Sequence, residues 1–368
     1  MKLHIFNPEH DIALAANVRR FTAPHAARQL RSDVGFIPAL WADDGDFVVV
    51  DDVEMAVRRS RHLKPYVADV LYLTTDDLRE MVELNGSVQH LDVQPWGWDQ
   101  GVAEVLRKAG LGDFCLSDKQ LRDIRELSGR QWAAANLLPT LRQNLPFPTV
   151  GESQFVAREA DLAFSESHPL VLKSPWSSSG RGIRYANDRQ QWERNLTWAR
   201  RVIRQQGGIM VEPFYDKVKD FAMEFETMDN GTAVYKGLSL FTTKNGAYTG
   251  NIIATERAKR DILSKFIPEN ALDILKNAII ELVQTELLNR HTYAGPFGID
   301  MMIVRTENDE TAVHPCVELN LRRTMGHAAL SIACDETMPQ RVMRLEYTDR
   351  YRLKIVNTNE NVVDGYVL

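Results

Sequence analysis

Residues 172–183 read LKSPWSSSGRGI, and this stretch is the most informative in the chain. A short apolar strand ends at Lys173 and runs directly into a loop of small, hydroxyl-bearing and glycine residues. Few side chains obstruct the backbone of such a loop, so its N–H groups can lie over phosphate oxygens. It is not a Walker loop, because the chain contains no GxxxxGK[ST]. Taken alone, an ordinary hairpin with an exposed lysine explains the stretch equally well.

A second informative pair of segments lies at 298–302 (GIDMM) and 317–322 (VELNLR). Alternate residues of a strand share a face, so Glu318, Asn320 and Arg322 are predicted to project together. Asp300 would join them from a paired strand. Oxygen ligands of this kind suit magnesium, and the fixed guanidinium would stabilise charge on a transferring phosphoryl group or acyl phosphate. The alternative is a strand with a solvated polar face.

A third segment, 208–214 (GIMVEPF), is a strand that ends in an acid and a proline, with Asp220 shortly after it. Its apolar backbone could lie along an adenine edge, which would leave Glu212 and Asp220 near the amino group and the ribose. The alternative is a buried strand that leaves the core at a proline.

The first region alternates short apolar runs, at 3–6 and 46–50, with helical stretches at 12–30 and 55–61. This alternation predicts a parallel α/β domain. There is no GxGxxG, which argues against a dinucleotide site. The polar cluster 7–11 (NPEHD) follows the first strand, where ligands commonly bind in α/β sheets. The alternative for this cluster is a strand-to-helix turn with Asp11 as the helix cap.

The pattern of the rest of the sequence predicts helices and strands in the order of an α+β fold. The expected helices span 117–138, 188–204 and 268–289, and the expected strands span 170–173, 209–212, 221–228, 232–241, 248–253, 297–304, 312–319 and 351–356. The last strand is expected to pack back on the body of the molecule. A hairpin at 244–251 carries Lys244, Tyr248 and Asn251, which face either a substrate or solvent.

Composition and charge narrow the function. A chain of 368 residues predicts two or three subdomains, and a net charge of −6 without a basic run gives no reason to expect nucleic acid as a partner. No apolar segment is long enough to span a bilayer, and the amino terminus lacks the apolar core of a signal peptide. Cys115, Cys316 and Cys334 are widely spaced and form no CxxC pair. We therefore expect a cytoplasmic protein without disulfides, in which Cys316 and Cys334 are core residues.

The order of these segments resembles the ATP-grasp superfamily: a helix with a basic residue, Lys173 with its loop, VEPF, GID and then ELNLR. The resemblance covers roughly 113–332 and is strongest in the final segment. It implies an α/β and α+β protein in which an N-terminal α/β domain of the pre-ATP-grasp type precedes a two-subdomain ATP-grasp fold. The implied boundaries are 1–112, 113–207 and 208–335, with 336–368 as a C-terminal segment packed on the body.

The resemblance also implies roles for particular residues. Lys173 would bind phosphate and share catalysis with Arg322. The covering loop would comprise Ser177, Ser178, Ser179, Gly180, Arg181 and Gly182. Val211, Glu212 and Asp220 would lie at the adenosine, and Asp300, Glu318 and Asn320 would bind magnesium. Where the family tends to carry an earlier lysine, this chain has Ser128-Gly129-Arg130, so Arg130 is the candidate, with Lys119 as its competitor.

The implied activity is an ATP-dependent ligase that uses ATP and Mg²⁺ to join a carboxylate to an amine through an acyl phosphate, releasing ADP and phosphate. Its partners would be small-molecule or peptide carboxylates and amines, without nucleic acid or membrane, and the N-terminal domain would help to bind the acceptor. A small-molecule kinase on the same scaffold is the first alternative, and the ATP site does not discriminate the two. A catalytically silent nucleotide-binding module is the second. The complete set of Asp300, Glu318, Asn320 and Arg322 argues against a silent module.

Overall fold

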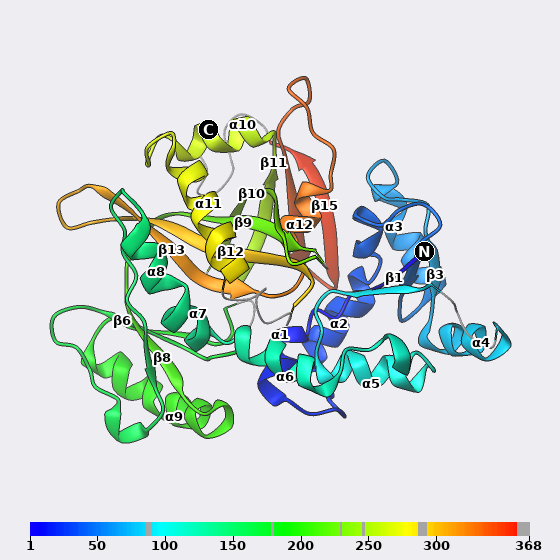
Figure 1. Ribbon diagram of the computed structural model, residues 1–368, viewed down its shortest axis with the longest axis horizontal. Coiled ribbons are helices and arrows are strands. Elements are labelled where there is room, and N and C mark those ends of the chain that lie inside the picture. Colours follow the sequence, from blue (N-terminus) through cyan, green and yellow to red (C-terminus); the bar gives the residue numbers. More distant parts are fainter. Residues whose placement is uncertain (86–89, 178–179, 229, 245–246, 286–292, 359–368) are drawn as a thin grey trace.

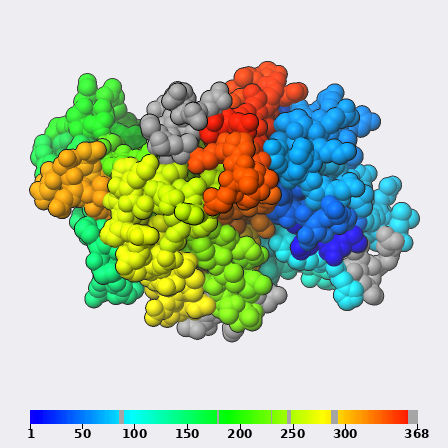
Figure 2. All heavy atoms as spheres, turned by 90° about the horizontal axis from the view of Figure 1, so that it is seen from above, coloured from blue at the N-terminus to red at the C-terminus, as the bar shows by residue number. Residues whose placement is uncertain are grey.

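The computed structural model describes residues 1–85, 90–177, 180–228, 230–244, 247–285 and 293–358. Three sheets form the body of the molecule. The N-terminal sheet lies at one end, a four-stranded sheet with α9 lies at the other, and a seven-stranded sheet stands between them (Figure 1). Figure 2 shows the same order from above. Among the described residues, no helix is long and apolar enough to cross a membrane.

The N-terminal sheet is parallel throughout, in the order β3-β2-β1-β4, which confirms the predicted parallel α/β domain. Its strands are β1 Lys2–Ile5, β2 Phe47–Val49, β3 Leu71–Leu73 and β4 Asp92–Pro95. Its helices are α1 His10–Ala16, α2 His25–Val34, η1 Ile37–Leu40, α3 Val53–Ser60, η2 Arg61–Leu63, α4 Thr75–Asn85 and α5 Gln100–Lys108.

The helical stretch predicted at 12–30 is two helices rather than one. Asn17 ends α1 in the left-handed conformation, with φ 49°, which asparagine adopts more readily than most residues. Pro24 stands immediately before α2, and its own φ and lost N–H suit the start of a helix. The intervening residues 17–24 are a loop.

The middle region contains the predicted helical stretch 117–138 and the small four-stranded sheet. Gly129 divides that stretch into α6 Asp118–Leu127, which begins with a capping box at Ser117, and α7 Arg130–Asn136. The remaining helices are η3 Gly112–Phe114, α8 Leu138–Asn144, η4 Glu159–Asp161 and α9 Arg189–Gln206. The antiparallel sheet, in the order β5-β8-β6-β7, comprises β5 Gln154–Val156, β6 Leu170–Lys173, β7 Ile183–Ala186 and β8 Ile209–Pro213. β8 therefore pairs with the strands before α9, not with those that follow it.

The seven-stranded sheet is antiparallel, in the order β13-β12-β9-β10-β11-β14-β15. Its strands are β9 Asp216–Thr227, β10 Ala233–Lys244, β11 Ala247–Ile253, β12 Gly295–Arg305, β13 Thr311–Asn320, β14 Arg341–Tyr347 and β15 Tyr351–Asn357. The helices of this region are α10 Glu256–Leu263, α11 Ala271–Val283 and α12 Met325–Leu330. The C-terminal segment packs on the body by extending this sheet past β11.

The largest apolar core covers one face of the seven-stranded sheet. Phe225 of β9 and Ile299 of β12 pack there with residues of α7, α8 and α11. Because successive strand residues point to opposite faces, Glu224 and Asp300 project to the other side. This polar face is where the candidate site lies.

Candidate functional site

Lys173 ends β6, and its ammonium pairs with the carboxylate of Glu212 on the neighbouring strand β8. The pairing is diagonal, since Glu212 lies opposite Val171 in register. Both side chains are buried, and Ser153 Oγ donates a hydrogen bond of 2.9 Å to Glu212. Burial opposes the ionisation of Glu212, but the Lys173 charge and the hydrogen bonds together hold its pKa below the ordinary value. The lysine and the acid that the sequence singled out therefore meet as a charged pair.

The loop after Lys173 folds back tightly on itself. Ser174 N donates to Gly182 O at 2.8 Å, and Gly180 has a φ of +69°, which glycine adopts without strain. A Cβ at Gly182 would lie 2.1 Å from Ser177 Oγ, so the close approach requires glycine. Arg181 is exposed. Ser178 and Ser179 lie outside the described residues.

Arg130 joins this loop to the far sheet. It begins α7, and its buried guanidinium donates to Ser174 O at 2.6 Å and to Ser177 Oγ at 2.8 Å. The same guanidinium pairs with Glu318 at 2.8 Å. Lys119, its competitor in the sequence, is exposed on α6 and pairs with Asp123 at 2.6 Å. The geometry places the arginine, rather than the lysine, between the loop and the predicted metal strand.

The predicted metal-binding residues meet across two paired strands. Asp300 of β12 lies opposite Glu318 of β13, and Gly298 lies opposite Asn320. Burial, and after it the negative charges of Glu318 and Glu224, raise the pKa of Asp300 well above its ordinary value. The structure thus gathers the two carboxylates and the amide on one face, as the alternation predicted.

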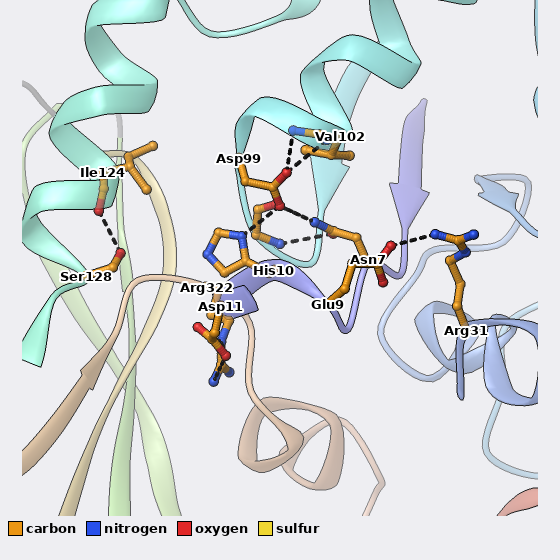
Figure 3. Close-up of polar contacts among 12 residues, drawn as sticks. Asn7, Glu9, His10, Asp11, Arg31, Asp99, Val102, Ile124, Ser128 and Arg322 are labelled. Atoms are coloured by element: carbon orange, nitrogen blue, oxygen red, sulfur yellow. Dashed lines mark hydrogen bonds and ion pairs between the residues drawn. The ribbon is translucent and has the colours of Figure 1, made fainter. Parts of the chain in front are cut away.

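Arg322 links these residues to the N-terminal domain. Its guanidinium donates to Asn320 Oδ1 at 2.8 Å and pairs with Asp11 at 3.0 Å. Figure 3 shows Asp11 directly against Arg322, below the cluster at the end of β1. Burial opposes the ionisation of Asp11, but the Arg322 charge holds its pKa below the ordinary value. Asp11 is not the cap of α1, because Glu9 holds that position and makes no capping hydrogen bond with its side chain.

The other residues assigned to the adenosine lie apart in the fold. Val211 is half-buried in β8 and lies opposite Leu172 and Gln154. Asp220 lies on β9, in the larger sheet, where it pairs with Lys217 at 2.5 Å and accepts from Thr243 at 3.0 Å.

Two residues of the predicted hairpin bond to each other instead of facing outward. Tyr248 donates to Asn251 Oδ1 at 2.6 Å, and Asn251 Nδ2 donates to the Ser239 hydroxyl at 2.7 Å. Asn251 is buried, so the surface-hairpin interpretation does not apply to it. The side chain of Lys244 lies outside the described part of the chain.

His314 on β13 is a residue of this site that the sequence did not reveal. It is buried beside the Lys173–Glu212 pair, neither ring nitrogen has a hydrogen-bond partner among the described residues, and burial lowers its pKa to about 4. The register of β12 and β13 shifts between Asp300 and Met302. Alternation of faces counted back from Glu318 therefore does not predict the position of His314.

The side chains at this site bear on the expected binding of magnesium. Within the described ranges, no three His, Cys, Asp or Glu side chains are grouped so as to hold a metal ion on their own. Asp300 and Glu318 supply two carboxylates and Asn320 an amide oxygen, which fits magnesium because that ion takes its other ligands from water and phosphate. The raised pKa of Asp300 fits as well, since a cation would offset the repulsion between the two carboxylates.

Comparisons with known proteins give structural similarity without sequence similarity. No family model matches the sequence, and no curated protein matches it. A biotin carboxylase from Campylobacter jejuni, solved as a β,γ-ATP complex, superposes with a TM-score of 0.50 at 12% identity, over 94% of this chain and 75% of that chain. A pyruvate carboxylase from Rhizobium etli superposes with a TM-score of 0.51 at 13% identity, over 89% of this chain and 27% of that one. At these identities the similarity establishes the fold alone.

Proposed function

The chain has the ATP-grasp fold, and from this premise we propose that it is an ATP-dependent ligase that joins a carboxylate to an amine through an acyl phosphate. ATP would be converted to ADP, and phosphate would leave when the amine attacks the acyl carbon. The carboxylate and the amine are small molecules or peptides.

The observation that carries this proposal is the cross-strand pair of carboxylates, Asp300 and Glu318, held beside Asn320 and Arg322. Two neighbouring half-buried acids repel each other, and a strand needs no such pair for its stability. Magnesium bound there would bridge phosphate oxygens and neutralise their charge.

The chain's own cations have distinct positions around this pair. Lys173 and Arg130 lie on the side of the small-residue loop, where they would hold the phosphates. Arg130 already binds a carboxylate, and its planar donors suit phosphate oxygens equally well. Arg322 lies on the side of the N-terminal domain, where it would stabilise the acyl phosphate. ATP and the carboxylate would therefore meet between the two groups of cations.

A silent nucleotide-binding module would not require this full arrangement. Binding of a nucleotide alone needs the lysine, the loop and the adenosine contacts. It does not need Arg322 tied to both Asn320 and Asp11 on the opposite side of the carboxylate pair. The position of Arg322 therefore favours an enzyme over a silent nucleotide-binding module.

The fate of a carboxylate oxygen tests the proposal against the kinase alternative. In a ligase, the carboxylate oxygen that attacks the γ-phosphate becomes the bridge of the acyl phosphate and leaves with phosphate. We expect heavy oxygen placed in the carboxylate of an amino acid panel to appear in inorganic phosphate during turnover with ATP, magnesium and an amine. A stable phosphorylated product, with no inorganic phosphate and no transfer of label, would establish a kinase instead.

A further inference from the structure

A buried histidine–aspartate pair stands at the end of β1, outside the groups used above. Asp99 Oδ2 accepts from His10 Nδ1 at 3.1 Å and from Asn7 Nδ2 at 3.0 Å. Its other oxygen caps α5 by accepting from Gly101 N at 2.7 Å and Val102 N at 2.9 Å. The carboxylate is therefore fixed by both the strand end and the helix (Figure 3).

The ring of His10 is held in one orientation, and one of its nitrogens has no hydrogen-bond partner among the described residues. Donation from Nδ1 to Asp99 leaves the free lone pair on Nε2. Nε2 is enclosed and has no hydrogen-bond partner among the residues that the structure describes, a costly state for a buried polar atom. A Cβ at Gly97 would lie 2.7 Å from the ring, so only glycine permits this position. A ring oriented by a carboxylate, with an unpaired second nitrogen, is suited to accept a proton.

The position of the pair connects it to the candidate site. His10 begins α1 at the carboxyl end of β1, and the next residue, Asp11, binds Arg322 at 3.0 Å. In Figure 3 the ring lies between Asp99 on one side and Asp11 with Arg322 on the other. A group bound at Arg322 would therefore lie on the His10 side of this pair.

The same domain contains a comparison pair with a different position. His4 Nε2 lies 3.2 Å from Asp46, His4 is equally buried, and its Nδ1 also lacks a described partner. Asp46 precedes β2, so this pair is anchored at the amino end of the sheet, away from the edge where ligands bind in α/β folds. Burial thus accounts for both pairs, but only the His10 pair adjoins Arg322 through the next residue.

We propose that His10 is the general base that removes a proton from the acceptor ammonium, with Asp99 as the positioning residue; this rests on the proposed ligase function. The ammonium gives one proton to Nε2, and its nitrogen keeps the electron pair. That pair forms the C–N bond as the C–O bond to phosphate breaks and the phosphate takes the bonding electrons. The nitrogen then loses its second proton to the departing phosphate, and Asp99 stabilises the imidazolium until it releases its proton to water. The acceptor class is therefore an amine basic enough to arrive protonated.

Comparing ammonia with hydroxylamine as the acceptor distinguishes removal of the acceptor's proton from formation of the acyl phosphate. Both are small, but at neutral pH ammonia is protonated whereas hydroxylamine is largely neutral and needs no base. With the carboxylate identified by oxygen transfer, we expect His10→Asn to lower amide formation from ammonium on the order of 10²–10⁴-fold. Hydroxamate formation from hydroxylamine should remain near the wild-type rate. Asp99→Asn should lower the amide-to-hydroxamate ratio in the same direction, since asparagine also caps helices but does not stabilise an imidazolium.

The ratio of the two products is the decisive measurement, because loss of folded protein lowers both rates together. His4→Asn, the matched control, should leave the ratio unchanged even if it lowers stability, and His10→Gln provides a second test of the same position. Equal losses of both products in His10→Asn and His10→Gln, or an unchanged ratio, would overturn the proposed base. Failure of the wild-type protein to form any hydroxamate would overturn the ligase function itself, and the proposed base with it.

Discussion

At the scale of single residues, charge pairing distinguishes Asp300 from its neighbours. Lys173, Arg130 and Arg322 each lie against an acid, whereas Asp300 has no ion pair with any described residue. Its pKa is raised by burial and by the charges of nearby acids. An acid in this state lowers the stability of the folded protein at neutral pH.

Asp300→Asn is therefore predicted to stabilise the metal-free protein by on the order of 1 kcal/mol at neutral pH. The pKa of Asp300 is higher in the folded than in the unfolded state. Such an acid contributes fully to stability at a pH below its pKa in the unfolded state. That contribution is lost as the pH rises through its pKa in the folded state. The advantage of asparagine should shrink as the pH is lowered. Urea denaturation of the wild-type protein and the variant at several pH values measures this difference in stability. A variant less stable than the wild type at neutral pH would contradict the repulsion between Asp300 and the nearby acids.

Sequence patterns predicted the residues of this face but not all of their partners. Glu318, Asn320 and Asp300 follow from the alternation of strand residues, a purely local rule. The position of His314 depends on a shift of register, and that of Asp11 depends on a contact with Arg322, 311 residues later in the chain. No local pattern contains either piece of information.

At the scale of elements, α12 shows how closely the backbone approaches the polar face of the sheet. The helix begins with a capping box between Thr324 and His327, lies over β10 and β11, and also contacts β9. A Cβ at Gly326 would stand 1.9 Å from Glu224 Oε1 and 2.5 Å from Ser239 Oγ. Glycine at this position allows the buried Glu224 to fit beneath the helix.

Gly326→Ala is predicted to destabilise the protein although alanine favours helices. Helix propensity alone would stabilise by about 1 kcal/mol, but overpacking typically costs about 1–3 kcal/mol, and here the clash involves a buried carboxylate. Gly112→Ala is the control, because among the described residues its methyl would meet only Arg107 Cγ, at 3.8 Å, and should change stability by less than about 0.5 kcal/mol. Equal urea midpoints for the two variants would show that α12 does not pack as described.

Element prediction succeeded where periodicity was strong and failed where strands were short or their partners distant. The strands β9 to β13 and β15 of the central sheet were located within a few residues of their bounds, but β14, Arg341–Tyr347, was not predicted. The three-residue β3 and β5 were not predicted, because so short a segment has no measurable period. The placement of β8 with β5 and β6 could not be predicted either, since pairing across a sheet depends on register with distant strands.

At the scale of the whole molecule, contacts far apart in the sequence join the N-terminal domain to the rest. Arg125 of α6 donates to Leu14 O at 2.7 Å, and Asp33 of α2 accepts from Tyr351 N of β15 at 2.9 Å. Arg322 and Asp11 add a third connection beside the carboxylate pair. The resemblance in the sequence implied an N-terminal domain in front of the site, and the structure adds the residues through which it contacts the site.

The Lys173 loop and the Asp300–Glu318 strands are proposed to bind ATP with magnesium, and isothermal titration calorimetry measures this binding directly. We predict one ATP site in the presence of magnesium, weakened about 10–100-fold by Lys173→Met, since a hydrogen bond to a charged group contributes about 1.5–3 kcal/mol. Lys119→Met, on the exposed face of α6, should bind as the wild type does. Circular dichroism establishes that both variants are folded. Absence of binding to the wild-type protein at millimolar ATP and magnesium, or equal affinity in folded Lys173→Met, would contradict the account.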